Sequence, residues 1–205
     1  MRRPGCLIPL IAGVAVLLLL VLPLIGSYNS LVDKEESADQ SFADLDAQLQ
    51  RRADLLPNLV AAVRGALQQE QAVFGEIARA RQNYAGAESP EEKFEASNQL
   101  ESALGRLLVI VEAYPQLLSN QNVQDLQVQI EGTENRIAQA RRDYNGVVTD
   151  YNKATRRFPR NLVAGLFGFD RKPLFEATAD ADTPPVVDLE ITTTVPTTVT
   201  TAPAG

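Results

Sequence analysis

The sequence predicts an all-α protein: an N-terminal transmembrane helix, an antiparallel up-down four-helix bundle, and a disordered C-terminal tail. Three observations lead to this fold class. Residues 7–25 are uncharged and apolar, residues 28–157 repeat apolar side chains every three or four positions, and residues 176–205 are rich in Thr and Pro. The expected domains are therefore an anchor at 1–26, a helical bundle at 27–175 and a tail at 176–205.

The apolar segment LIPLIAGVAVLLLLVLPLI occupies residues 7–25 and contains no charge. A helix needs about 20 such residues to cross the hydrocarbon core of a bilayer. A cleaved signal peptide is the competing interpretation, because Arg2 and Arg3 are basic and Gly26-Ser27 offers a cleavage site. Cleavable apolar regions are typically about 7 to 15 residues long, so we expect an uncleaved signal-anchor.

The charges around this segment predict its orientation. Arg2 and Arg3 precede it, whereas residues 27–50 contain six acids and only one base, Lys34. Basic flanks stay in the cytoplasm, so we expect a cytoplasmic N-terminus, an extracytoplasmic C-terminal domain and a single pass through the cell membrane.

Four helices are expected in the bundle, over residues 28–55, 57–85, 90–114 and 120–157. Ser89-Pro90-Glu91-Glu92 is a helix-start signal, with Ser at the N-cap, Pro at the first helical position and Glu at the third. Pro115 is expected to end the third helix, and the fourth stops before Pro159.

Pro57 lies within RRADLLPNLV, and we expect the chain to reverse there. A reversal makes the first three helices similar in length, about 37 to 43 Å, as an up-down bundle requires. Pro57 then begins the second helix at the distal tip, Arg52 lies in the last turn of the first, and Asp54 and Asn58 help to satisfy exposed backbone groups.

The tail from Glu176 to Gly205 carries five acids and no Lys or Arg. Such a composition cannot bury enough apolar surface to offset the entropy lost on ordering, so it predicts disorder.

Five segments of the bundle carry a resemblance to known proteins: YNSLV at 28–32, QLQRRADLLPNLV at 48–60, ARARQNY at 78–84, YPQLLSNQNVQDLQVQIEGTENRIAQARRDYNGVVTDYN at 114–152 and FPRNLVAGLFGF at 158–169. Through these segments, about residues 28–176 resemble the LemA family. The resemblance implies antiparallel helices behind one transmembrane segment, in a bacterial envelope protein whose biochemical role is not established. Val123 stands where the family pattern suggests an aromatic residue.

Most enzyme chemistry is disfavoured by composition. The chain has no His and one Cys, Cys6, which excludes Ser-His and Cys-His nucleophiles and imidazole metal sites. We expect no cofactor, and the acidic balance with scattered basic residues argues against nucleic acid as a partner. Glu35, Glu70, Glu101 and Glu134 could face inward, although solvated or ion-paired carboxylates are the simpler interpretation.

Heights along the expected bundle bring certain side chains together. Tyr28, Tyr84 and Tyr151 should share one layer near the membrane, either as core packing or as a docking surface. Glu35, Arg81 and Arg141 fall at similar heights, which predicts an ion pair or triad that would set helix register.

The segment FPRNLVAGLFGF at 158–169 should emerge at the membrane end. Its apolar residues bordered by Arg156, Arg157, Arg160 and Arg171 could lie in the lipid interface, or the segment could pack against the bundle base.

The expected function is that of a non-enzymatic, membrane-anchored scaffold or adaptor of the cell envelope, binding the bilayer through residues 7–25 and an unidentified envelope protein, with self-association possible. The alternative is a carboxylate-based metal or hydrolytic enzyme in the bundle core. The candidate interaction or structural residues are Tyr28, Asn29, Arg52, Asp54, Pro57, Asn58, Tyr84, Tyr144, Asn145, Tyr151, Asn152, Phe158 and Pro159.

Overall fold

The computed structural model describes residues 7–67 and 69–176, and within them every regular element is a helix. The predicted tail lies outside this range apart from Glu176, as does Cys6. The helices are α1 (Leu7–Val63), α2 (Gln71–Gly86), α3 (Pro90–Glu112), α4 (Pro115–Leu118), α5 (Gln121–Arg156) and α6 (Arg160–Phe167). The all-α prediction is confirmed.

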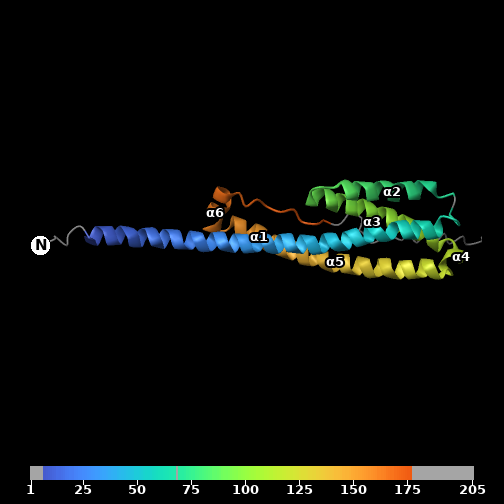
Figure 1. The fold of residues 1–205 in the computed structure, drawn as a ribbon, viewed down its shortest axis with the longest axis horizontal. Helices are drawn as coiled ribbons and strands as arrows, with labels where there is room; N and C mark the ends of the chain where they lie inside the picture. Colours follow the sequence, from blue (N-terminus) through green and yellow to red (C-terminus); the bar gives the residue numbers. More distant parts are fainter. Residues whose placement is uncertain (1–6, 68, 177–205) are drawn as a thin grey trace, which may run out of the picture.

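A long antiparallel pair, α1 with α5, forms the backbone of the molecule (Figure 1). The shorter hairpin of α2 and α3 packs beside it and covers only the end farther from the N-terminus (Figure 1). Four helices therefore run up, down, up and down as expected, but the N-terminal part of α1 projects beyond the others.

The reversal predicted at Pro57 is wrong, because α1 continues through Pro57 to Val63. A proline in a helix interior removes one backbone hydrogen bond and costs about 3 kcal/mol. Leu56, Leu59 and Val63 are all fully buried, and their burial offsets that cost. The bundle covers this longer helix because α5 runs beside it and the α2–α3 hairpin caps its far end.

The later helix boundaries follow the local signals. Ser89 and Glu92 form the predicted capping box at the start of α3. Asn120 caps α5 by accepting a hydrogen bond from the Asn122 N–H at 3.0 Å. Pro115 does not extend α3 but begins the one-turn helix α4.

Gly168 ends α6 in the left-handed conformation, with φ of 76°. This region favours glycine because a Cβ atom would be strained there. The chain turns at this point and returns along the bundle as an extended segment, residues 170–176, which we call the strap (Figure 1).

Among the residues described, no helix combines the length and apolar composition that a membrane crossing needs. The helix expected over residues 7–25 is confirmed as the first part of α1, but its passage through a membrane is not.

Candidate functional site

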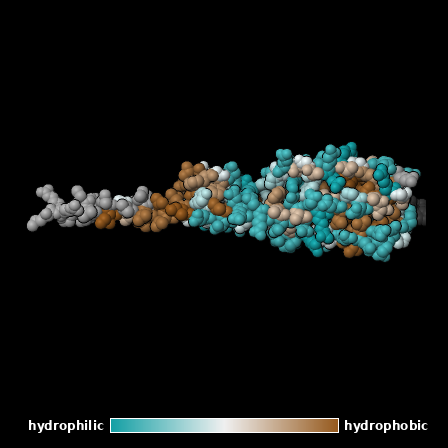
Figure 2. All heavy atoms as spheres, in the orientation of Figure 1, coloured by the Kyte–Doolittle hydropathy of each residue, from teal (hydrophilic) through white to brown (hydrophobic). Residues whose placement is uncertain are grey.

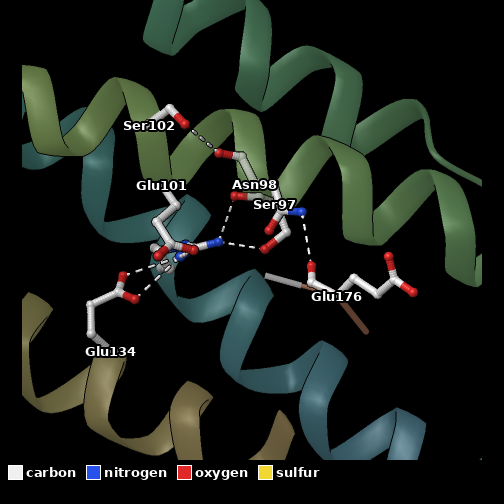
Figure 3. A network of polar contacts seen from close by, with 7 residues as sticks. Ser97, Asn98, Glu101, Ser102, Glu134 and Glu176 are labelled. Atoms are coloured by element: carbon white, nitrogen blue, oxygen red, sulfur yellow. Dashed lines mark hydrogen bonds and ion pairs between the residues drawn. The ribbon is translucent and has the colours of Figure 1, made fainter. Parts of the chain in front are cut away.

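Arg52 is the largest fully buried side chain, with 1% of its surface exposed. Its guanidinium lies between α1, α3 and α5. It donates to the Ser97 carbonyl oxygen at 2.7 Å and to the Ser97 hydroxyl, and it pairs with Glu134 at 3.2 Å. Glu101 completes the group at 3.7 Å. Figure 3 shows Ser97, Glu101 and Glu134 converging on this position from two helices.

Burial raises the pKa of the Glu134 carboxyl, although the positive charge of Arg52 opposes that shift. Desolvation of the carboxylate therefore outweighs its attraction to Arg52. An ion pair of this kind specifies geometry more than it adds net stability. The Arg52 cluster thus joins α1 to α3 and α5 by directional polar contacts.

The cluster bears on the alternative of a carboxylate-based enzyme. Glu101 and Glu134 meet, but both carboxylates are already engaged by the Arg52 guanidinium. Glu35 and Glu70 lie elsewhere: Glu35 accepts from Tyr151, and Glu70 precedes the first turn of α2. Within residues 7–67 and 69–176, no three acidic, Cys or His side chains are grouped to hold a metal ion.

Two asparagines of α5 hold the strap. The Asn145 side-chain amide donates to the Phe175 carbonyl oxygen at 2.9 Å and accepts from the Phe175 N–H at 2.8 Å. Asn152 makes the same reciprocal pair with Lys172, at 2.8 and 3.0 Å. Positions 145 and 152 are two turns apart on one face of a helix, so they clamp an extended segment at two points.

Side chains reinforce this clamp. The Tyr144 hydroxyl donates to the Pro173 carbonyl oxygen at 2.8 Å, and burial raises the pKa of Tyr144 to about 12. Phe175 is 3% exposed and its ring lies 4.5 Å from that of Phe94. Lys172 pairs with Asp39 at 2.5 Å. Phe175 thus joins the strap to the folded core, and Tyr144, Asn145 and Asn152 share the structural role of holding it.

Replacing Asn152 by Asp is expected to loosen the strap. A carboxylate cannot donate to the Lys172 carbonyl oxygen, and losing a buried hydrogen bond costs about 1–3 kcal/mol. We expect a matching fall in the free energy of unfolding, measured by chemical denaturation. The Lys172 N–H keeps its acceptor, because Asp retains the side-chain oxygen that receives it. Asn29→Asp, at an exposed position, is the control; equal effects of the two variants would contradict the clamp.

The three tyrosines predicted to share a layer do not do so. The Tyr84 hydroxyl donates to Asp46 at 2.6 Å, so it lies 18 residues beyond Tyr28 along α1 (from 28 to 46), or about 27 Å. Tyr151 lies between them, with its hydroxyl 3.5 Å from Glu35. Because α1 does not reverse at Pro57, everything on α2 lies closer to the distal end than predicted.

The ion pair predicted among Glu35, Arg81 and Arg141 is also wrong. Glu35 lies 3.9 Å from Lys172, and Arg141 lies over the Phe175 ring at 5.6 Å. Arg81 lines a groove between α1 and α2 that also contains Pro57. Because α1 does not reverse at Pro57, Arg81 on α2 lies farther along the bundle than Glu35.

The remaining predicted residues are at the surface. Asn29, Asp54, Asn58 and Phe158 are exposed, and Pro159 is half-buried. Asp54 accepts a hydrogen bond from the Gln50 side chain at 3.1 Å and is not at a helix end.

The sequence predicts Arg52 at a helix end, and it predicts neither the partners of Arg52 nor the strap. A signal for Arg52 was present in the spacing. The buried residues Leu45, Leu49, Leu56, Leu59 and Val63 follow a three-four repeat in which position 52 is the missing core site. For the strap residues Lys172 and Phe175, the helical spacing offered no comparable signal.

Comparison with known proteins identifies one family and several similar proteins. A family model described as the LemA family matches residues 41–189, which begins later and extends further than the resemblance noted above. Magnetosome protein MamQ 2 of Paramagnetospirillum magneticum is 26% identical over 187 residues, covering 78% of this chain and 69% of that protein. Magnetosome protein MamQ of Magnetospirillum gryphiswaldense is 26% identical over 210 residues, covering 90% of this chain and 77% of its own length.

Proposed function

This chain belongs to the LemA family, and from that premise we propose that it is a non-enzymatic, membrane-anchored scaffold or adaptor of the bacterial cell envelope. The observation that carries the proposal is the continuity of α1. Its 57 residues form one helix, about 86 Å long, that joins an exposed apolar segment directly to the bundle core. A partner bound to the bundle would be held at a defined distance from whatever that segment occupies.

A lipid bilayer is the partner that best fits the apolar segment at residues 7–25. Leu19 is 74% exposed, Ile11 63% and Leu22 61%, and the run of 19 residues from Leu7 to Ile25 has no charge. Exposed apolar surface of this extent marks an interaction site. The arginines before it and the acids after it favour a cytoplasmic N-terminus and an extracytoplasmic bundle.

The bundle itself supports a structural role. Its buried polar groups, at Arg52 and along the strap, are engaged in holding helices and chain segments together. The similar proteins are named as magnetosome proteins, and an organising role at a cellular membrane structure is compatible with those names.

Membrane fractionation tests the anchor. The full chain is expected to remain with the membranes after alkaline washing. A variant carrying Leu18→Lys and Leu19→Lys, both exposed near the middle of the apolar segment, is expected to be released, because a Lys at the centre of a membrane-spanning helix costs about 2.5–3.5 kcal/mol. A variant with Val109→Lys and Val128→Lys, both exposed on the bundle, is the control and should be retained. Release of the unmodified chain would refute the proposal.

In-cell crosslinking from exposed Asn58 tests the adaptor role. We expect adducts with one envelope protein. Adducts with a second copy of this chain alone would contradict the adaptor role and indicate self-association instead. Protease added to spheroplasts should cleave the tail. Protection of the tail would contradict the proposed orientation and place the bundle in the cytoplasm.

A further inference from the structure

The helix α6 has two unlike apolar faces. Val163 and Ala164 are buried against Leu31 of α1 and Ala154 of α5. Its other apolar side chains are largely exposed: Leu166 is 78% exposed, Phe167 59% and Leu162 57%, and Phe158 just before the helix is 80% exposed. We call Phe158, Leu162, Leu166 and Phe167 the apolar collar. Packing against α1 and α5 therefore explains the buried side chains of α6 but not its exposed apolar ones.

The collar lies at a defined place on α1. The Tyr28 ring contacts the rings of Phe167 and Phe169, with centroids 4.9 and 5.6 Å apart. Tyr28 lies three residues after Ile25, where the uncharged apolar run ends. Figure 2 shows the hydrophobic surface of α6 adjoining that of α1 where α1 leaves the bundle.

Four arginines flank the collar in the sequence. Arg156 and Arg157 precede α6, Arg160 begins it, and Arg171 follows it. In the part of the chain that the structure describes, none of these four arginines is paired with an acid, and one acid, Asp170, lies among them in the sequence. Arginine side chains can lay their stems along apolar surface and extend their charge to anionic lipid headgroups.

From this arrangement we propose that the apolar collar of α6 inserts into the interfacial region of an anionic bilayer, with the flanking arginines on its phosphate groups. The inference rests on the proposed function, because α1 must bring α6 to the membrane. Its consequence is mechanical. A single helix through a bilayer leaves the bundle free to tilt. A second contact through α6 would fix the orientation of the bundle relative to the membrane.

The chain contains no tryptophan, so single tryptophans can report position without background. The full chain is reconstituted in vesicles of zwitterionic lipid, with or without anionic lipid, containing brominated acyl chains that quench tryptophan. Three variants are compared: Leu166→Trp in the collar, Leu22→Trp in the N-terminal segment, and Val109→Trp at the distal end of α3. All three positions are exposed.

We expect Leu166→Trp to be blue-shifted and to lose most of its emission in anionic vesicles, and Val109→Trp to be unaffected. Adding Arg157→Gln and Arg160→Gln should weaken the quenching of Leu166→Trp. Quenching of Leu22→Trp without that of Leu166→Trp would overturn the collar inference alone. Absence of quenching at both positions would overturn the membrane anchor as well.

A blue shift of Leu166→Trp without bromine quenching would also refute the inference, because it would place the collar against a second copy of the chain. Circular dichroism of each variant establishes that the helices remain intact. Leu166 and Val109 make few internal contacts, so both substitutions are expected to be tolerated.

Discussion

Arg52→Ala is expected to lower the free energy of unfolding by about 3–5 kcal/mol. The substitution removes the largest fully buried side chain, leaves a cavity among α1, α3 and α5, and deprives Glu134 and the Ser97 carbonyl of their donor. Chemical denaturation followed by circular dichroism measures the change.

Arg51 provides a matched control, because it is the same residue type one position away and exposed. Arg51→Ala should change stability by less than about 0.5 kcal/mol. In a double-mutant cycle, Arg52→Met combined with Glu134→Leu should cost much less than the two single changes added together, since neither charge is then left without its partner. Equal effects of Arg51→Ala and Arg52→Ala would show that the cluster is not a structural element.

Phe175→Ala should have the second large effect, a loss of about 3–5 kcal/mol. The Phe175 ring closes the core between α3 and α5, where it contacts Phe94 and the Arg141 guanidinium. Its loss should also free the strap, so that the amides of Lys172 and Phe175 exchange faster than the α5 backbone. Hydrogen exchange and denaturation together measure the two effects.

Leu174→Ala is the control for the strap, because Leu174 is the neighbouring residue and is 43% exposed. It should leave the exchange of the Lys172 amide unchanged. If Phe175→Ala lowered stability without accelerating exchange in the strap, the strap would be held by its asparagines alone.

Helix identity and most boundaries could be predicted from sequence because their causes are local. The Ser89 capping box, Asn120 and Pro159 each act within about one turn of the backbone they satisfy or interrupt. The start of α3 and both ends of α5 therefore appeared where expected.

Pro57 shows where local reasoning was insufficient. A proline predicts a break, but its cost is of the same order as the burial of one or two large apolar side chains. Whether α1 continued depended on what covered Leu59 and Val63, and that was decided by α5 and the α2–α3 hairpin. The error displaced Tyr84 by about 27 Å and separated Arg81 from its predicted partners.

The sequence alone determined an all-helical protein of the LemA family, the four main helices, and the unusual composition at both ends, because helical periodicity, caps and charge are properties of neighbouring residues. Only the tertiary structure decided that Arg52 is buried, that Asn145 and Asn152 clamp a strap, and that α6 exposes one apolar face. Those outcomes depend on which segments meet in space, and helical spacing does not specify contacts between segments that are well separated in the sequence.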